Sequence, residues 1–245
     1  MQFRFYFRPD KPLTLPLGYH HTLQGFVYHL ILDQNPNFSE FLHQSGYSSE
    51  RQFKLFCFSL ISARSIRVKR PYITFYGDIS FELRSPIAEF CRTVLMALTS
   101  VYRVELNNQP MTFLKCEVSN RIIEEDELHI RMLSPLTLST TIYVNDKKKT
   151  RYIAPYDDDF PGAFTQNTLN KLASVGIDAY DNDIKISPEL ENSRDKYVTK
   201  FDNRIYITAW KGDYLLSAPP EILTFLYNTG IGSRNSQGFG MFEPI

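Results

Sequence analysis

The sequence has few of the features that mark secreted, membrane-spanning or zinc-binding proteins. Only three cysteines occur among 245 residues, Cys57, Cys91 and Cys116, and neither their number nor their spacing suggests a disulfide framework or a zinc site. No apolar run approaches the roughly 18 residues that a membrane span requires. The N-terminus alternates apolar and polar residues and carries arginines, which indicates a strand and not a signal peptide. We therefore expect a cytoplasmic protein with reduced thiols and no membrane partner.

Net charge is also lacking, because 27 Lys and Arg balance 27 Asp and Glu. This balance argues weakly against nucleic-acid binding, but the charges are unevenly distributed. Residues 1–118 carry 13 basic and 9 acidic side chains, whereas residues 119–245 carry 14 and 18. A neutral total can therefore hide a basic face. An apolar content of 43%, rich in Phe and Tyr, indicates a globular chain with a substantial core.

Two similar series of elements are predicted along the chain from hydrophobic periodicity. The first comprises a strand at 2–8, helices at 21–32 and 38–45, strands at 53–61 and 72–83, a helix at 87–99 capped by Ser85, and a strand at 113–118. The second comprises a strand at 128–138, a basic turn at 147–151, a helix at 160–172, strands at 197–201 and 204–210, a helix at 221–228 and a last strand. This order predicts an α+β protein of two tandem ferredoxin-like (βαββαβ) domains, residues 1–118 and 119–245.

The most distinctive stretch is residues 230–241, which read GIGSRNSQGFGM. Glycine permits positive φ and close backbone approach, and successive N–H groups in such a loop can form an anion site, to which Arg234 adds a cation suited to phosphate. No Lys-Ser/Thr follows the last glycine, so the stretch is not a P-loop, and too few residues remain for a dinucleotide-binding βαβ unit. A glycine-rich hairpin between two ordinary elements stays open as the alternative.

Three side chains from adjacent predicted elements could together catalyse phosphoryl chemistry. His43 ends a short helix, where the helix dipole raises a histidine pKa toward values suited to acid–base work. Tyr28 lies on the first long helix, and Lys54 begins the segment that follows His43. A histidine, a tyrosine and a lysine could move protons and stabilise a pentavalent phosphate without a metal ion or other cofactor. The alternative is that these are structural or exposed side chains.

Two further charged segments have both a functional and a structural interpretation. Arg64, Arg67 and Lys69 could follow a phosphate backbone while nearby aromatic residues stack on bases, or they could be the solvated tip of a hairpin. The acidic run at 157–159 precedes a predicted helix, so we interpret it as a cap that complements the helix dipole, with metal binding as the alternative.

An ordered set of motifs resembles the CRISPR-associated repeat-processing endoribonucleases, the sixth Cas family of the repeat-associated RNA-binding superfamily. The glycine loop is similar to that family's signature loop. Five other segments match in order along nearly the whole chain: residues 15–28 with Leu-Gln-Gly inside, 41–43, 54–59, 133–136 and 208–210, together with the helix at 167–171.

The resemblance implies a fold of two tandem ferredoxin-like domains and single-site cleavage of the CRISPR repeat in precursor RNA, which yields mature crRNAs for antiviral defence. His43 would be the general acid/base, Tyr28 would assist as a base or position the ribose, and Lys54 would stabilise charge on the phosphate, with Arg51 as a second candidate. The 2′-hydroxyl would attack its own phosphorus and give a 2′,3′-cyclic phosphate and a 5′-hydroxyl, without a metal. DNA would bind but not react.

The resemblance also implies RNA contacts for the glycine loop, which would pack the domains together and touch RNA without taking part in catalysis. The loop residues expected to contact RNA are Gly230, Gly232, Ser233, Arg234, Asn235, Gly238 and Gly240. Arg64, Arg67 and Lys69 are expected to contact the phosphate backbone of the RNA as a second group. The precursor RNA is the expected partner, and effector-complex subunits or a second copy of the chain are further candidates. Two alternative functions stay open: a catalytically inactive crRNA-binding subunit, and a small-molecule enzyme that uses the loop for a cofactor.

Overall fold

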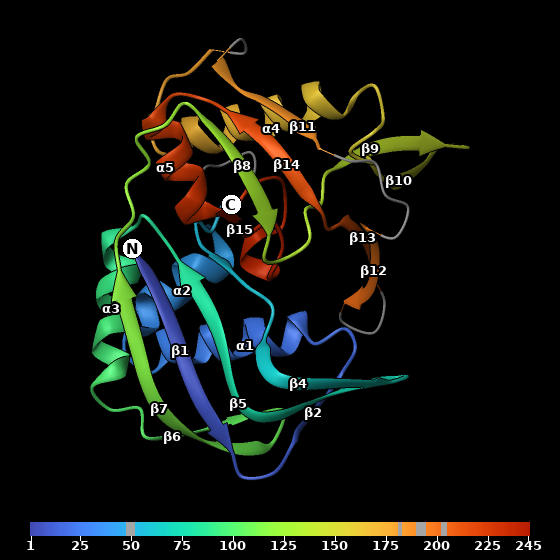
Figure 1. Cartoon of the computed structure of the whole chain (residues 1–245). Coiled ribbons are helices and arrows are strands. Elements are labelled where there is room, and N and C mark those ends of the chain that lie inside the picture. The colour runs from blue at the N-terminus through green and yellow to red at the C-terminus, as the bar shows by residue number, and fades with distance from the viewer. Residues whose placement is uncertain (48–51, 181–182, 190–194, 202–204) are drawn as a thin grey trace.

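The computed structural model consists of two α+β halves stacked on each other, with both termini near the junction between them (Figure 1). It describes residues 1–47, 52–180, 183–189, 195–201 and 205–245. Among these residues, no helix is both long and apolar enough to cross a membrane.

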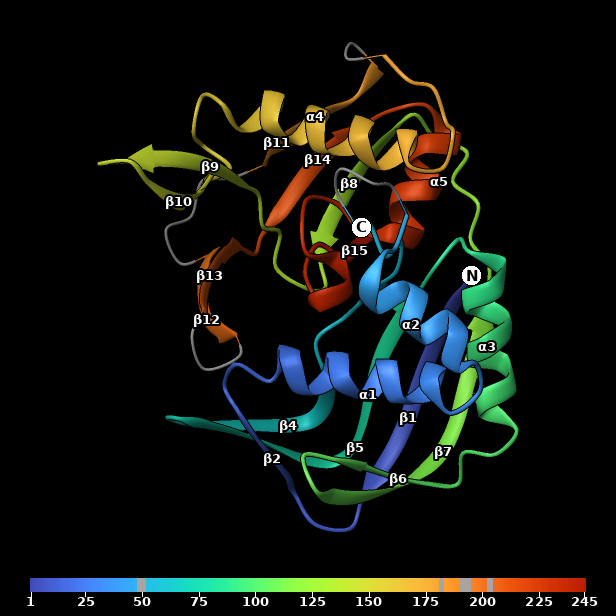
Figure 2. The same ribbon diagram turned by 180° about the vertical axis from the view of Figure 1, so that it is seen from behind.

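The N-terminal half is built around β1, which lies at the centre of an antiparallel sheet. β5 and β7 flank β1, while β2, β3 and β4 pair with β5, and β6 pairs with β7. The helices cover one face of this sheet (Figure 2). The elements are β1 (Gln2–Pro9), β2 (Leu13–Pro16), α1 (His20–Leu32), α2 (Pro36–Gln44), β3 (Cys57–Phe58), β4 (Ser62–Lys69), β5 (Tyr72–Arg84), α3 (Ala88–Leu98), β6 (Arg103–Leu106) and β7 (Gln109–Ser119).

The C-terminal half repeats this arrangement with a smaller sheet, in the order β11-β14-β8-β15. Two hairpins, β9–β10 and β12–β13, stand apart from it as separate two-stranded sheets. The elements are β8 (Glu127–Met132), β9 (Ser139–Val144), β10 (Lys147–Tyr152), α4 (Phe160–Ala173), β11 (Lys185–Pro188), β12 (Lys196–Phe201), β13 (Ile205–Trp210), β14 (Asp213–Ser217), α5 (Pro220–Thr229) and β15 (Phe242–Pro244).

The three central strands are arranged alike in both halves, which confirms the predicted tandem ferredoxin-like fold. β1 lies between β5 and β7, and β8 lies between β14 and β15. In sequence, α1 and α2 lie between β1 and β5, as α4 lies between β8 and β14, and α3 follows β5 as α5 follows β14. The arrangement buries the alternating apolar residues of β1 (Phe3, Phe5 and Phe7) under α1 and α3.

The predicted strand at 53–61 is wrong except for β3, which pairs with β5. The segment is apolar because it passes between two cores, not because it belongs to a long strand. Leu55 packs into the C-terminal core with a positive φ of 53°, while Phe56 and Phe58 pack into the N-terminal core. A left-handed residue interrupts any regular ladder.

Three smaller predictions also differ from the structure. The strand predicted at 128–138 ends early, because β8 stops at Met132. Residues 147–151 are not a turn but most of β10, and the turn lies just before them at Asn145 and Asp146, which both have positive φ. Ser85 lies two residues before the N-cap Ile87, whose N–H it accepts at 3.1 Å, while its own hydroxyl donates to the Leu55 carbonyl at 2.8 Å. The serine therefore ties α3 to the segment between the cores.

A buried arginine, which forms an ion pair within β5, joins the two halves. Arg84, at the end of β5, is 1% exposed and donates to Glu82 at 2.7 Å and to the Phe242 carbonyl of β15 at 2.7 Å. Its guanidinium also stacks on the Tyr227 ring of α5, 3.9 Å from the ring centroid. Glu82 is paired a second time with Arg4. Because both partners are buried, losing either one would leave a desolvated charge.

Candidate functional site

The glycine loop adopts a conformation that only its glycines allow. Gly230, Gly232, Gly238 and Gly240 all have φ between 69° and 84°. None of the four has room for a side chain, because a Cβ at each position would lie less than 3.0 Å from another atom. A Cβ on Gly240 would lie 1.9 Å from the Ile231 carbonyl oxygen, and one on Gly238 would lie 2.5 Å from the Phe58 ring. The two glycine pairs therefore bring the two ends of the loop together and seat the loop on the N-terminal half.

Five backbone N–H groups of this loop donate to carbonyls within the protein, so they are not available to the anion site that the sequence suggested. Those of Ile231, Ser233 and Gly240 donate to the carbonyls of Gly240, Thr137 and Pro135, and those of 237 and 238 donate within the loop. The four glycines are buried, whereas residues 233–237 are half exposed. The surface that the loop presents to a ligand is therefore made by residues 233–237, and the glycines determine its shape.

A single buried lysine joins the first glycine pair of the loop to the polar segment that follows it. Lys171 of α4 donates through Nζ to the Gly230 carbonyl at 2.6 Å, the Gly232 carbonyl at 3.3 Å and Asn235 Oδ1 at 2.7 Å. Asn235 then donates through Nδ2 to the carbonyls of residues 231 and 239. Burial lowers the pKa of Lys171 to about 7, while three oxygen acceptors match the three donors of an ammonium group.

A buried histidine connects the loop to α1 and to the β12–β13 hairpin. His20 stacks on Phe239 with parallel rings 4.4 Å apart, and its Nδ1 lies 3.2 Å from the Gln237 carbonyl. Since a carbonyl only accepts, Nδ1 carries the proton, and Nε2 accepts from the Tyr197 hydroxyl at 3.0 Å. Burial lowers the pKa of His20 to about 4, so the ring is neutral at pH 7.

The loop surface forms one wall of a cleft of about 580 Å³ between the two halves, which we call the catalytic cleft after the predicted catalytic side chains that line it. It contains two of the three predicted catalytic side chains, Tyr28 from α1 and Lys54. The loop contributes Arg234, a predicted RNA contact. The complete lining is His21, Gln24, Gly25, Tyr28, Gln52, Lys54, Phe201, Arg234, Ser236 and Gln237.

Helix α2 brings the third predicted residue to the same region. His43 lies in the last turn of α2, and Gly46 ends the helix with a φ of 60° and an N–H bond to the Phe41 carbonyl at 2.8 Å. A Cβ on Gly46 would lie 3.3 Å from Lys54 Nζ, so the lysine packs against the end of α2. The negative end of the helix dipole favours positive charge there. Arg51, the second candidate, lies outside the described residues.

Burial shifts the pKa values of two cleft residues. It raises the pKa of Tyr28 to about 12, so its phenol is protonated at pH 7. Burial lowers the pKa of Lys54, as expected for an ammonium that is partly removed from water.

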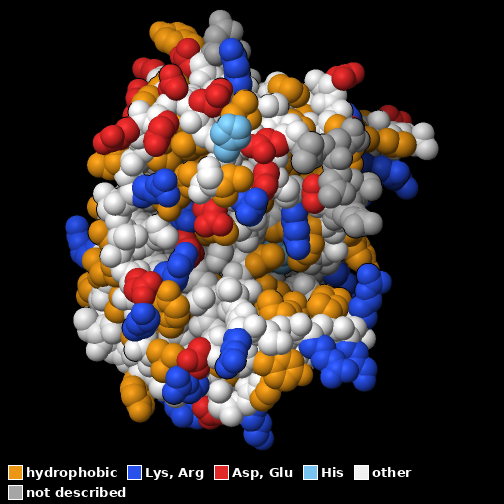
Figure 3. Space-filling model, in the orientation of Figure 1, with side chains coloured by type: hydrophobic (Ala, Val, Ile, Leu, Met, Phe, Trp, Pro, Cys, Tyr) orange, Lys and Arg blue, Asp and Glu red, His pale blue; other side chains and the backbone are white. Residues whose placement is uncertain are grey.

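Arg64, Arg67 and Lys69 lie outside the cleft. All three are exposed on β4, whose hairpin with β5 projects from the sheet (Figure 1). Ile66, Val68 and Tyr72 of this hairpin are exposed as well. Figure 3 shows basic side chains gathered at the lower right of the molecule, over this hairpin. The hairpin thus offers both cations and apolar surface, the combination that single-stranded nucleic acid requires.

Two aspartates of the acidic run at 157–159 form ion pairs with an arginine. Arg151 of β10 donates to Asp159 at 2.7 Å and to Asp157 at 3.3 Å, and Asp157 also accepts the Ala154 N–H. Asp159 is the N-cap residue of α4, but its side chain makes no capping hydrogen bond. Within the part of the chain that the structure describes, no three His, Cys, Asp or Glu side chains gather as metal ligands would.

Comparison with known proteins identifies the family. Residues 116–244 match the family described as "CRISPR associated protein Cas6, C-terminal", and residues 14–119 match "CRISPR-associated protein Cas6, N-terminal". The chain belongs to the Cas6 family.

Cas6 proteins are also similar to this chain over its whole length. A Methanocaldococcus jannaschii protein named "CRISPR-associated endoribonuclease Cas6 2" is 29% identical, and the match covers 100% of both chains. Among solved structures, "CRISPR associated protein Cas6" aligns with a TM-score of 0.80 and 23% identity, covering 100% of this chain and 99% of the other. "An RAMP protein binding different RNA substrates" aligns with a TM-score of 0.84 and 18% identity, with the same coverage. These structures share the tandem ferredoxin-like fold.

The sequence interpretation missed the residues that hold this Cas6 loop in place. Lys171 and Asn167 fall at helical spacing with Phe160 and Phe164, so they belong to the buried stripe of α4. Two polar residues on an apolar helix face are a signal for a polar network inside the fold. His20 gave no such signal, because its partners are more than 170 residues away.

Proposed function

We propose that this chain is a metal-independent endoribonuclease that cleaves CRISPR repeat sequences in precursor crRNA and so produces mature crRNAs for antiviral defence. The observation that carries the proposal is the catalytic cleft, where Tyr28 and Lys54 meet the loop residue Arg234 beside the end of the helix that carries His43. Membership of the Cas6 family and a relative named as an endoribonuclease support the same activity.

The reaction is a transesterification within the RNA. The 2′-oxygen before the scissile bond forms a bond to the adjacent phosphorus while the bond from phosphorus to the 5′-oxygen breaks. The products are a 2′,3′-cyclic phosphate and a 5′-hydroxyl. His43 transfers a proton, either from the attacking 2′-hydroxyl or to the leaving 5′-oxygen. The protonated Tyr28 positions the ribose by donating a hydrogen bond, and Lys54 stabilises the charge that develops on the non-bridging oxygens.

RNA enters the cleft along surfaces of both halves. Residues Ser233 to Gln237 of the loop contact it from one side, and the β4–β5 hairpin, with Arg64, Arg67 and Lys69, guides the strand outside the cleft. We also propose a domain boundary between residues 118 and 119, and the three free cysteines support a reducing, cytoplasmic location. Association with effector-complex subunits, or with a second copy of the chain, stays a prediction.

The deciding experiment is cleavage of an end-labelled CRISPR repeat RNA from the source organism in the presence of EDTA. We expect one cut with a cyclic-phosphate end, and no cut when the scissile position carries a 2′-deoxy sugar. His43→Ala should abolish cleavage and leave RNA affinity within a few-fold. Tight binding without a cut by the unaltered protein would instead identify a catalytically inactive crRNA-binding subunit.

A further inference from the structure

A buried amide oxygen on α4 has no hydrogen-bond partner among the described residues. Asn167 is 6% exposed, and its Nδ2 donates to Ser233 Oγ at 3.3 Å, while Oδ1 accepts from none of them. A buried acceptor without a partner costs about 1–3 kcal/mol, so its presence calls for an explanation.

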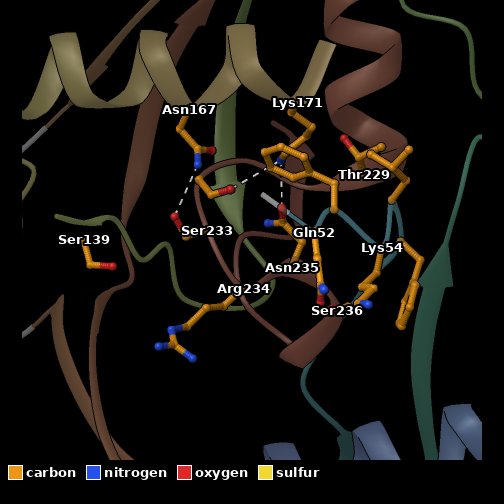
Figure 4. Close-up of a pocket in the computed structure, with 14 residues that line it drawn as sticks. Gln52, Lys54, Ser139, Asn167, Lys171, Thr229, Ser233, Arg234, Asn235 and Ser236 are labelled. Atoms are coloured by element: carbon orange, nitrogen blue, oxygen red, sulfur yellow. Dashed lines mark hydrogen bonds between the residues drawn. The ribbon is translucent and has the colours of Figure 1, made fainter. Parts of the chain in front are cut away.

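The amide faces a cavity of about 300 Å³, which we call the side pocket (Figure 4). The loop residues Ser233 and Ser236 form one wall and Phe53 forms another. The neighbouring polar groups on the same wall, Lys171 Nζ and the Asn235 amide, have their partners within the protein. Among the described groups of this wall, Asn167 Oδ1 is therefore the buried acceptor without a partner, and a ligand would reach it by a turn of this side chain toward the pocket.

The side pocket adjoins the catalytic cleft. Gln52, Lys54, Arg234 and Ser236 line both. A nucleotide whose phosphate lies at Lys54 in the cleft would thus have its own base, or that of a neighbour, within reach of the side pocket. A volume near the lower end for ligand pockets suits one flat ring and not a base pair.

The polar groups facing the pocket select among the four bases. Asn167 Oδ1 is an acceptor, and Ser233 Oγ, which already accepts from Asn167, has its hydroxyl proton to donate. An acceptor beside a donor complements the edge of adenine or cytosine, where an amino group lies next to an unprotonated ring nitrogen. On their Watson–Crick edges, uracil and guanine present a carbonyl next to an N–H and so reverse the pattern.

We propose that the side pocket binds one unpaired adenine or cytosine of the RNA next to the scissile phosphate, with Asn167 accepting from its amino group and Ser233 donating to its ring nitrogen. This inference rests on the proposed function, because it places the base relative to the cleavage site. It adds a specificity-determining residue, Asn167, which takes no part in the chemistry.

Binding of uncleavable RNA tests the inference separately from cleavage. Repeat RNAs with a 2′-deoxy sugar at the scissile position are varied one base at a time at the two nucleotides on either side of it, and their dissociation constants are measured. At one position, we expect adenine or cytosine to bind about tenfold more tightly than uracil or guanine. Asn167→Ala and Ser233→Ala should each reduce this preference to within twofold.

Asn170→Ala is the matched control, because Asn170 lies on the same helix, accepts from the exposed Gln166 and does not line the pocket. It should retain the full preference. Thermal melting of all variants shows whether they are folded. If Asn167→Ala does not fold, Ser233→Ala still tests the inference. Equal affinity for all four bases, a preference for uracil or guanine, or a preference that survives in both pocket variants would overturn the inference. Base preference without any cleavage of the ribose form would contradict the proposed function alone.

Discussion

Lys171 Nζ lies 2.7 Å from Asn235 Oδ1, and this contact joins the last turn of α4 to the middle of the glycine loop. The same ammonium bonds two loop carbonyls, so one side chain holds the first glycine pair and the polar segment in a fixed relationship. Arg234 and Ser236, which line the catalytic cleft, flank Asn235. The position of this side of the cleft therefore depends on Lys171, which is itself buried.

Lys171→Met should therefore loosen the loop. The substitution keeps much of the volume but leaves three oxygen acceptors without a donor, which we expect to destabilise the fold by about 3 kcal/mol and to reduce cleavage. Lys185→Met, at an exposed position of β11, is the matched control. Its melting temperature should lie within about a degree or two of that of the unaltered protein. Thermal melting and single-turnover cleavage are the measurements. Equal melting of the Lys171 and Lys185 variants would show that the clamp contributes nothing.

Gly240→Ala should impair folding more than any substitution elsewhere that adds one methyl group. Its Cβ would lie 1.9 Å from the Ile231 carbonyl oxygen, at a φ of 77°, so the loop must move. Gly162→Ala, in the first turn of α4, meets no atom within 4 Å and should be neutral or stabilise by about 0.5–1 kcal/mol. Chemical denaturation measures both. A Gly240 variant as stable as the Gly162 variant contradicts the close approach.

His20 should make stability depend on pH in the mildly acidic range. Its pKa is about 4 in the folded protein and about 6.5 in the unfolded chain, so the unfolded chain binds more protons between these values. Stability is fully present above pH 6.5 and falls as the pH is lowered toward 4, by about 3 kcal/mol in total. Denaturation at pH 7 and pH 4.5 should show this loss, and His20→Gln should flatten that part of the profile. An unchanged slope in the variant would show that other groups are responsible.

Lys54 and Tyr28 should affect cleavage more than binding. Lys54→Ala removes a cation that acts on the transition state, and we expect a loss of about 10² to 10³ in the cleavage rate. Tyr28→Phe removes only the hydroxyl that positions the ribose, and we expect a smaller loss, about tenfold. Lys11→Ala, on the exposed edge of the N-terminal half, is the control. Single-turnover rates and affinities for 2′-deoxy RNA separate the two effects, and a loss confined to affinity would move both residues from catalysis to binding.

The β4–β5 hairpin should contribute through salt-dependent binding. Each contact with a phosphate of single-stranded RNA makes the slope of log K against log salt about 0.7 more negative, so replacing Arg64, Arg67 and Lys69 with Gln should make it about 2 less negative. Affinity should fall for all sequences alike.

A control variant removes three exposed basic residues from elements at the opposite edge of the sheet: Arg92, Arg103 and Lys115. Its salt slope should stay near that of the unaltered protein. If both triple variants lose the same slope, the effect comes from net charge and not from a track along the hairpin.

Local patterns predicted the architecture well because the regular elements follow from local periodicity. The amphipathic pattern at 21–32 and the alternating apolar residues at 2–8 are each found in the structure as α1 and β1. The order of these elements was sufficient for the tandem ferredoxin-like fold. By contrast, the apolar run at 53–61 has the composition of a strand, and only the presence of a second core explains why it is buried without forming one.

The site was harder to predict because its parts meet through long-range contacts. Tyr28, His43 and Lys54 were selected by residue type and by family resemblance, and the cleft then brings Tyr28 and Lys54 together. Two hydrogen bonds of the loop backbone could not be predicted from the sequence, since they go to the carbonyls of residues 135 and 137, about a hundred residues away. The buried Lys171 and the amide of Asn167 depend on the same long-range packing.

The segment between the two cores has a consequence for how the protein unfolds. Leu55 contributes to the C-terminal core while its neighbours Phe56 and Phe58 contribute to the N-terminal one, and Arg84 bonds a carbonyl of the last strand. The C-terminal half thus completes its interior with a residue of the N-terminal half, and a buried arginine of the N-terminal half bonds its last strand. Despite two separate sheets, the chain should unfold in one cooperative transition, and residues 119–245 expressed alone should form a loosened, partly ordered state and not an independent domain.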